Sequence, residues 1–164
     1  MILHAGLVAL RLEGLWRGAL IRGPSGAGKS DLALRALDAG FRLVADDRTL
    51  VWASGGRLFG RAPDPLAGLI EARGQGVLAE SPIPLAQVTV LVDCAAPAEI
   101  ERLPDPENEE VAGIRLPRLW LDPREPSAPA KLRRAMQHLG AATQQAYQAT
   151  SRGGGGRTGT GDTH

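Results

Sequence analysis

The stretch Ala19-Leu20-Ile21-Arg22-Gly23-Pro24-Ser25-Gly26-Ala27-Gly28-Lys29-Ser30 decides the fold predicted for this chain, because it contains the pattern Gly-x-x-x-x-Gly-Lys-Ser. An apolar run over residues 19–21 precedes the pattern, and a helix-like run over residues 31–38 follows it. A strand before and a helix after form the setting in which this pattern makes a phosphate-binding P-loop. A chance glycine-rich turn would have to match all four fixed positions and both flanks, so we predict a P-loop.

Each part of this loop has an expected role in holding a nucleoside triphosphate. Glycines allow backbone angles that a Cβ would forbid, so the loop can turn its N–H groups inward, and the following helix adds the positive end of its dipole. Lys29 is expected to reach the β- and γ-phosphates, and the Ser30 hydroxyl to coordinate Mg²⁺. The predicted nucleotide-binding residues are Gly23, Pro24, Ser25, Gly26, Ala27, Gly28, Lys29 and Ser30.

The composition fits one globular domain. The chain has 164 residues, 43% hydrophobic content and a net charge of +1, so nothing in the overall charge indicates binding to nucleic acid or to a membrane surface. No apolar run reaches the roughly 18 residues of a membrane-spanning helix. The single cysteine, Cys94, excludes an intramolecular disulfide and is expected to be buried near the end of a strand. Together these features favour a cytoplasmic protein.

The residues around the loop predict an α/β fold. Residues 3–12 and 18–21 have strand character, with a turn at residues 14–17, and residues 29–40 form a helix that ends at a glycine. Residues 43–45 are expected to return to the sheet beside the strand that precedes the loop. A right-handed crossover places the carboxyl ends of both parallel strands at one edge of the sheet. Asp46, which follows the second strand, is therefore expected beside the P-loop.

The rest of the chain completes a mixed β-sheet flanked by helices. Residues 49–60 predict a hairpin, and residues 87–93 the strongest strand. We expect a mobile surface segment over residues 95–113, and an extended piece at a sheet edge over residues 114–121 because Pro117 interrupts it. A last helix is predicted over residues 130–150, with an inner stripe formed by Leu132, Met136, Leu139, Thr143 and Ala146. The domain is expected to span residues 1–150, and the glycine-rich residues 151–164 to be disordered.

Acidic residues near the loop are the candidates for chemistry. A carboxylate beside a P-loop can hold Mg²⁺ through water or take the proton from an attacking hydroxyl, and Asp46 and Asp47 are placed for either role. The alternative is that the carboxylate only caps a turn, and this alternative carries more weight for Asp47 than for Asp46. Glu71 could join Ser30 on Mg²⁺, which prefers few protein ligands and several waters. His4 and the arginines indicate little by themselves.

Three segments, residues 21–31, 42–47 and 70–76, together resemble the catalytic domain of the HPr kinase/phosphorylase family. His4 lies upstream of the loop, where that family carries a functional histidine, and residues 101–103, Glu-Arg-Leu, resemble its short arginine motif. The resemblance covers residues 1–134 and is dense up to Asp93. It implies the P-loop fold of the HPr kinase and PEP carboxykinase type.

The resemblance also implies an activity. Members of the family transfer the γ-phosphoryl group of ATP to a serine of HPr, the phosphocarrier of the sugar phosphotransferase system, and many run the reverse step with inorganic phosphate to give pyrophosphate. The implied catalytic residues are His4, Lys29, Asp46 and Arg102, with Asp46 as the base, and the implied Mg²⁺ ligands are Ser30 and Glu71. Because the chain starts almost at the catalytic domain, we expect a short form without the family's N-terminal domain. Family members are commonly hexamers, which implies a homo-oligomer.

Two other functions remain open. A small-molecule P-loop kinase usually carries an arginine-rich lid, which the acidic, proline-rich residues 95–113 do not resemble. A nucleotide-binding regulator would bind ATP and form no phosphorylated product.

Overall fold

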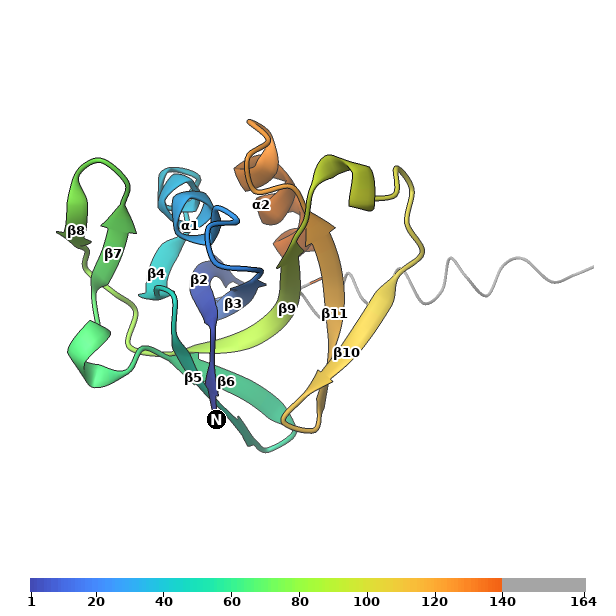
Figure 1. The fold of residues 1–164 in the computed structure, drawn as a ribbon. Helices are drawn as coiled ribbons and strands as arrows, with labels where there is room; N and C mark the ends of the chain where they lie inside the picture. Colours follow the sequence, from blue (N-terminus) through green and yellow to red (C-terminus); the bar gives the residue numbers. More distant parts are fainter. Residues whose placement is uncertain (140–164) are drawn as a thin grey trace, which may run out of the picture.

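The computed structural model describes residues 1–139, which form a strongly curled mixed β-sheet with two α-helices on one face (Figure 1). The helices are α1 (Lys29–Asp38) and α2 (Ala128–Leu139), with short 3₁₀ turns at Asp64–Leu66 and Pro97–Glu99. The strands are β1 (Ile2–Leu3), β2 (Ala5–Leu12), β3 (Leu15–Arg22), β4 (Arg42–Ala45), β5 (Thr49–Ser54), β6 (Arg57–Arg61), β7 (Leu69–Ala72), β8 (Gly76–Ala79), β9 (Ala86–Cys94), β10 (Glu107–Val111) and β11 (Ile114–Leu121). The large sheet has the order β1-β5-β6-β9-β3-β2-β4, and β11 also pairs with β9 and carries β10. Strands β7 and β8 form a separate hairpin.

The first hairpin corrects the predicted position of β4. The turn consists only of Glu13 and Gly14, whose φ angles are +53° and +77°, so β3 begins at Leu15 and the predicted turn over residues 14–17 is wrong. Strand β2 therefore occupies the edge of β3, and β4 pairs antiparallel with β2 instead of lying beside β3. Since β3 and β4 are both antiparallel to β2, they run in the same direction. Their carboxyl ends still meet at one edge, where Asp46 was expected.

Strand β9 is the central strand of the sheet. It pairs in parallel with β3 and antiparallel with β6 through its first residues, where Leu58 lies opposite Val88. Its last residues, Leu91 to Cys94, pair in parallel with β11. The segment 95–113 contains strand β10, so the prediction of a mobile surface segment is wrong for residues 107–111. The prediction of an edge holds for residues 114–117, which pair with β10 alone, and is wrong for residues 118–121, which pair with β9. Pro117 precedes the first β11 residue that pairs with β9, so it removes no hydrogen bond to β9.

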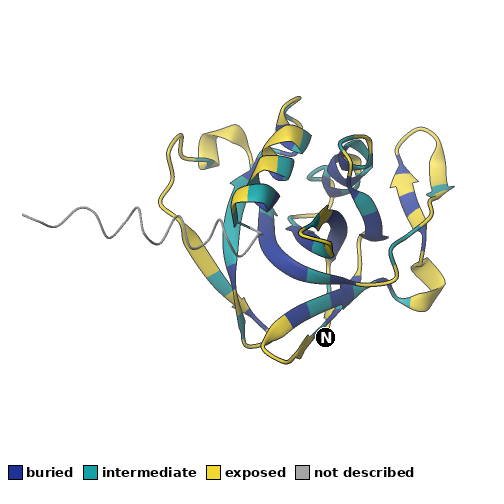
Figure 2. Ribbon diagram, turned by 180° about the vertical axis from the view of Figure 1, so that it is seen from behind, coloured by how far each residue is buried: buried dark blue, intermediate teal, exposed yellow. Residues whose placement is uncertain are grey.

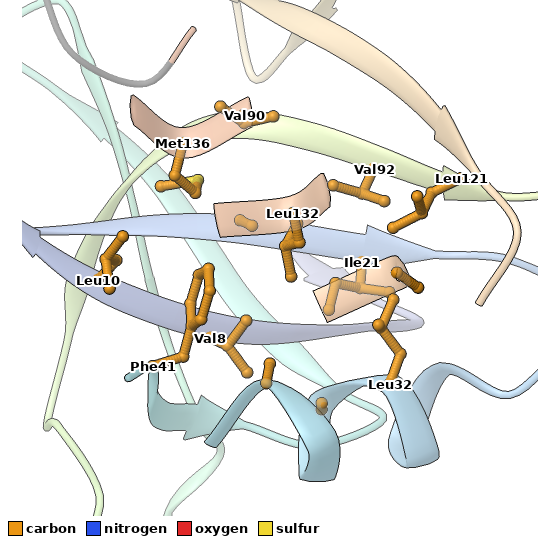
Figure 3. Close-up of a cluster of buried hydrophobic side chains, with 14 of the residues drawn as sticks. Val8, Leu10, Ile21, Leu32, Phe41, Val90, Val92, Leu121, Leu132 and Met136 are labelled. Carbon is orange, nitrogen blue, oxygen red and sulfur yellow. The ribbon is translucent and has the colours of Figure 1, made fainter. Parts of the chain in front are cut away.

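The helices bury one face of the sheet. Leu32 of α1 and Leu132 and Met136 of α2 are fully buried, and they pack against Val8, Ile21, Val90 and Val92 (Figure 3). The predicted stripe of the last helix is confirmed for Leu132 and Met136, and Leu139 is partly buried. Thr143, Ala146, the predicted end of this helix and the tail at residues 151–164 lie outside the described residues, so those expectations stay predictions.

A second core fills the inside of the curl. Leu7, Leu20, Leu58 and Leu91 are buried on the sheet face opposite the helices, and buried residues run through both β3 and β9 (Figure 2). Gly60 and Gly18 leave room for the Leu7 side chain, since a Cβ on either glycine would lie 2.6 Å from a Leu7 methyl group.

Leu132 offers a test of the packing of α2. Replacing Leu132 by alanine should lower the free energy of unfolding by about 2–5 kcal/mol, because it leaves a cavity between α2 and the sheet. Urea unfolding followed by circular dichroism measures this loss. Leu103, which is 88% exposed, provides the control: Leu103→Ala should change the free energy of unfolding by less than about 0.5 kcal/mol.

Within residues 1–139, no helix is both long and apolar enough to cross a membrane.

Candidate active site

The Gly-x-x-x-x-Gly-Lys-Ser segment forms a tight loop between β3 and α1. Gly26 and Gly28 have φ angles of +78° and +104°, a conformation that residues with a Cβ adopt rarely. A Cβ on Gly23 would lie 2.9 Å from the Cβ of Cys94, so β9 packs directly against the start of the loop. Gly28 is the N-cap of α1 and offers no side-chain acceptor. The first N–H groups of the helix are therefore open to an anion.

Lys29 is the residue around which the loop is wrapped. Its side chain is buried, with 9% of the residue exposed. Its ammonium Nζ donates hydrogen bonds to the carbonyl oxygens of Gly23, at 2.7 Å, and Pro24, at 3.0 Å. A buried ammonium group needs such partners, and these two carbonyls hold it inside the loop. The loop therefore presents a fixed positive charge together with its backbone N–H groups.

Asp46 joins the loop to the β7–β8 hairpin. The Ser30 hydroxyl donates to Asp46 Oδ1 at 2.8 Å, and the backbone N–H of Glu71 donates to Asp46 Oδ2 at 3.0 Å. The first bond confirms the expected meeting of the P-loop and Asp46 at one edge of the sheet. The second brings in Glu71, 25 residues further along the chain, on a hairpin that stands beside α1 (Figure 1).

A cavity of about 390 Å³ opens in front of these residues. It is lined by Ser25, Gly26, Gly28, Lys29, Ser30, Asp31, Leu34, Asp47, Glu71 and Arg73. Predicted residues of the loop thus share one cavity with Glu71, and Asp46 lies directly behind Ser30. Arg73 is a cation that the sequence analysis missed. Its position two residues after Glu71, at the end of a strand, was the available signal, since alternate strand residues face the same side.

His4 contacts Asp47, which lines this cavity. Asp47 has a φ of +64°, an uncommon angle for a residue other than glycine and one that clusters at functional sites. His4 Nδ1 lies 3.5 Å from Asp47 Oδ1, and the two side chains are 69% and 54% exposed. His4 itself does not line the cavity. The expected approach of His4 to the site is therefore indirect.

Arg102 does not meet the P-loop within this chain. It is exposed on the segment before β10 and lines a separate cavity with Trp120 and Arg134. The segment follows β9 toward β11, whereas Asp46 lies beyond β3 and β2 on the other side of the loop. The arginine that contacts the loop is Arg124, whose Nη2 donates to the carbonyl oxygen of Gly26 at 3.1 Å. Nothing in the local sequence pattern indicated Arg124, because its position depends on how the turn before α2 packs.

A second arginine anchors this turn. Arg35 of α1 donates from Nη1 to the carbonyl oxygen of Glu125 at 3.2 Å and from Nη2 to that of Pro123. The turn thus rests on both α1 and the P-loop.

A network of ion pairs lies at the end of β3, directly before the loop. Arg22, the last residue of β3, donates from Nε and Nη2 to the two carboxylate oxygens of Asp93 at 3.1 and 2.9 Å. Arg118 donates to the same carboxylate at 2.5 Å, and Arg22 also pairs with Glu109. Burial alone would raise the pKa of Asp93, but the hydrogen bonds from Arg22 and Arg118 outweigh it, and the pKa lies below its ordinary value. The carboxylate is therefore charged at neutral pH and fixes the residue that precedes Gly23.

Asp93 makes stability depend on pH. A carboxyl group with a lowered pKa in the folded state stabilises the fold above its unfolded pKa of about 3.9, and this contribution is lost as pH falls through the lower folded value. Asp93→Asn should lower the free energy of unfolding at pH 7 by about 1.5–3 kcal/mol and flatten its decline below pH 4. Chemical denaturation between pH 2 and 7 measures both effects. An unchanged acid profile in the variant would contradict this role, and Asp105→Asn, on an exposed loop residue, is the control.

Cys94 follows Asp93 and is buried, as predicted from its position at the end of a strand. Burial raises the pKa of its thiol to about 11, so the thiol is neutral at physiological pH. We assign it to packing against Gly23.

The donors at the cavity fit magnesium. No group of three or more histidine, cysteine, aspartate or glutamate side chains within residues 1–139 is arranged to hold a metal ion by itself. The Ser30 hydroxyl lies 2.8 Å from an Asp46 carboxylate oxygen, Glu71 lines the same cavity as Ser30, and all three side chains carry hard oxygen donors. Mg²⁺ is commonly bound by one or two such groups while it keeps several waters. This donor set therefore suits Mg²⁺ better than a softer metal.

Comparison with known proteins identifies the family. The model of the HPr serine kinase C-terminal domain matches residues 2–83, half of the chain, and this range contains the loop, Asp46 and Glu71. The chain belongs to this family. The resemblance inferred from the three sequence segments is thereby confirmed.

Individual members of the HPr serine kinase family are similar over shorter ranges. The HPr kinase/phosphorylase of Streptococcus sanguinis is 37% identical over a 114-residue alignment that covers 62% of this chain and 37% of that protein. That of Clostridium perfringens strain SM101 is 44% identical over 61 residues, 37% of this chain and 20% of that protein. The chain thus spans about one fifth to two fifths of the length of these relatives.

A solved structure agrees with the fold over nearly the whole chain. The HPr(Ser) kinase/phosphatase from Coxiella burnetii superposes with a TM-score of 0.74, covering 95% of this chain and 99% of that one, at 21% identity. This likeness confirms the predicted α/β fold with a mixed sheet flanked by helices.

Proposed function

We propose that this member of the HPr serine kinase family transfers the γ-phosphoryl group of ATP to a serine hydroxyl of an HPr-like phosphocarrier protein. One observation carries the proposal: the Asp46 carboxylate is hydrogen-bonded to Ser30 of the P-loop at 2.8 Å, beside the cavity that the loop lines. A triphosphate held by the loop would place its terminal phosphate within reach of a carboxylate. Such a group is what abstraction of a hydroxyl proton requires.

The loop supplies electrostatic stabilisation. Backbone N–H groups of the loop after Pro24, which has none itself, and the N-terminus of α1 would bind the phosphate oxygens, and the Lys29 ammonium would stabilise negative charge on the β- and γ-phosphates. Phosphoryl transfer depends mainly on positioning and charge stabilisation, and a buried, hydrogen-bonded lysine provides both.

Asp46 would handle the proton. In the forward direction the serine oxygen attacks the γ-phosphorus, the bond from that phosphorus to the bridging oxygen breaks, ADP leaves, and the hydroxyl proton moves to Asp46. In the reverse direction inorganic phosphate attacks the phosphoserine, pyrophosphate forms, and Asp46 returns the proton to the serine oxygen. The bonds from Ser30 and Glu71 orient the carboxylate for this role. His4, through Asp47, is proposed to assist, as the family resemblance implies. The same role is proposed for Arg102 from the resemblance alone, since Arg102 lines a separate cavity of this chain.

Ser30 and Glu71 would hold Mg²⁺ at the mouth of the loop. When bound, the ion would neutralise charge on the β- and γ-phosphate oxygens. Asp46, hydrogen-bonded to Ser30 Oγ and to the backbone N–H of Glu71, would keep both ligands in place.

The partner, assembly and location are proposed from the family alone. They are an HPr-like carrier as substrate, a homo-oligomer with the hexamer as the expected form, a cytoplasmic location, and no role in nucleic acid or membrane binding. The alternatives are a nucleotide-binding regulator and a small-molecule kinase. Neither accounts as directly for a carboxylate held at the loop together with the family match.

A labelling experiment tests the proposal. The protein is incubated with γ-labelled ATP, Mg²⁺ and an HPr-like carrier, and inorganic phosphate is added later. We expect label on a carrier serine, no label on a carrier with that serine replaced by alanine, and pyrophosphate after phosphate is added. Bound ATP with an unlabelled carrier would favour the regulator, and turnover of a metabolite without the carrier would favour the small-molecule kinase.

A further inference from the structure

Strand β9 contains an irregularity far from the P-loop. Gly18 of β3 lies opposite Val88, and the next residue, Ala19, lies opposite Val90, so Thr89 is an extra residue in β9. Val88 packs inside the curl and Val90 beneath the helices, and Thr89 belongs to neither core. A β-bulge of this kind turns a side chain away from the regular alternation, often beside a functional site. Thr89 therefore needs a separate explanation.

The Thr89 side chain is buried without a partner. The residue is 7% exposed, and its hydroxyl Oγ1 forms no hydrogen bond to any described residue. Leaving a buried hydroxyl unsatisfied is unfavourable, and native structures contain few such groups. An isosteric valine would avoid the cost. A ligand that accepts or donates a hydrogen bond at this position would explain the threonine.

The bulge lies where the sheet divides. Strand β6 pairs with β9 up to Val88, and β11 pairs with it only from Leu91, so Thr89 lies between the two pairings. Strands β6 and β11 diverge from each other here (Figure 1). A cavity of about 280 Å³ lies in the fork between β6 and β11. Its lining comes from β3, β6, β9 and β11 and from the turn before β6. The volume is just below the range of about 300–1,000 Å³ that holds drug-sized ligands, so it suits a small molecule or one functional group.

The charged groups of this cavity are all positive. Arg17, Arg57 and Arg115 line it, and no aspartate or glutamate does so. Arg17 is held by Glu13 at 3.4 Å, and only 12% of its side chain is exposed. Arg57 and Arg115 are exposed residues on β6 and β11, the two strands that diverge at the cavity. The planar guanidinium group of arginine binds carboxylate and phosphate groups through two parallel hydrogen bonds, and a nearby hydroxyl adds a donor.

We propose that this fork is a binding site for a small oxyanion, either a phosphate or a carboxylate group of a metabolite. Arg57 and Arg115 would grip the anion from the two diverging strands, Arg17 would add charge from the floor, and the Thr89 hydroxyl would donate the hydrogen bond that it lacks. The lining residues are distinct from those of the P-loop cavity, so the proposal does not depend on the kinase assignment.

Nuclear magnetic resonance of the full chain distinguishes the two cavities. Inorganic phosphate is titrated into ¹⁵N-labelled protein, citrate is titrated in a second arm, and sodium chloride at matched ionic strength is the control. We expect saturable shifts of the amides of Leu58, Thr89 and Leu116 with at least one anion and none with chloride. Shifts of residues 25–30 report phosphate in the P-loop separately, so failure of either site leaves the other measurable. Absence of saturable shifts around Thr89 with both anions would overturn the proposal.

Variants assign the binding to the named residues. Arg57→Gln and Arg115→Gln should each raise the dissociation constant measured at Thr89 about tenfold or more, since each removes a charge-assisted contact. Arg61→Gln, on the surface beside Asp64, is the matched control and should change it less than about twofold. Equal effects of Arg61→Gln and Arg115→Gln would mean that only overall charge matters and would overturn the site.

Thr89→Val separates a ligand-binding role from a structural one. Without anion, the variant should unfold at the same temperature as the parent or higher, because an unpartnered buried hydroxyl is removed. It should also bind the anion at least about fivefold more weakly. A lower unfolding temperature combined with unchanged anion binding would show that the hydroxyl serves the fold, and would overturn the proposal.

Discussion

Replacing Asp46 by asparagine should lower the rate of serine phosphorylation by a factor of about 10²–10⁴, the usual contribution of a positioned general base. The asparagine keeps the size of the side chain and can still accept one of the two hydrogen bonds from Ser30 Oγ and Glu71 N–H. ATP binding should therefore change little, since the loop and Lys29 hold the phosphates. Single-turnover labelling of the carrier measures the rate, and calorimetric titration measures ATP binding.

Asp47→Asn is the matched control for Asp46. Asp47 is adjacent in sequence and lines the cavity, but it contacts His4 rather than Ser30. The factor by which Asp47→Asn lowers the phosphorylation rate should be less than one tenth of the factor for Asp46→Asn. If Asp46→Asn phosphorylates the carrier at a near-normal rate while Asp47→Asn does not, the base is Asp47 and the assignment made above is wrong.

Replacing Lys29 by methionine should weaken ATP binding and lower the rate of serine phosphorylation. The substitution keeps much of the apolar stem but deletes the ammonium that donates to the carbonyl oxygens of Gly23 and Pro24. Loss of one preorganised electrostatic group typically costs a factor of about 10²–10³ in rate. The loop also loses two internal hydrogen bonds, so we expect the affinity for ATP to fall at least tenfold. Steady-state kinetics at varied ATP separates the two effects.

Lys131 provides the comparison for Lys29. It is a surface lysine that pairs with Glu125 at 2.7 Å, on the first turn of α2. Lys131→Met should change the rate and the affinity less than about twofold. Lys29→Met with normal ATP affinity and normal rate would mean that the loop does not hold the triphosphate.

Local signals in the sequence predicted the loop and its helix correctly. The glycine spacing and the apolar residues before and after it set the conformation between β3 and α1, and Gly40, with a φ of +94°, ends the helix as predicted. The juxtaposition of Asp46 with Ser30 was also predictable, since it depends only on the direction of two strands. The prediction holds although the predicted strand order was wrong, because β3 and β4 still run in the same direction.

Non-local pairing explains what the sequence could not predict. The position of β4 depends on whether the edge of β3 is already occupied by β2, which the short turn at Glu13 and Gly14 decides. The acidic, proline-rich composition of residues 95–113 favoured a loop, but β10 forms because β11 offers a partner.

The same reasoning applies to the arginines of the site. The arginine motif placed Arg102 at the site by resemblance, whereas tertiary packing brings Arg124 to the loop and leaves Arg102 in another cavity. Neither position is encoded in a periodic pattern. The sequence therefore predicts the conformation of the loop better than it predicts the positions of the arginines around it.

The most direct test of the central claim is a crystal structure with Mg²⁺ and a non-hydrolysable ATP analogue. An attacking oxygen lies about 3–3.5 Å from phosphorus and about 2.6–3.2 Å from its base. We therefore predict a γ-phosphorus in the cavity lined by Lys29 and Glu71, at most about 7 Å from the Asp46 carboxylate. A nucleotide bound elsewhere, or a γ-phosphate that points away from Asp46 and beyond that distance, would contradict the proposed kinase.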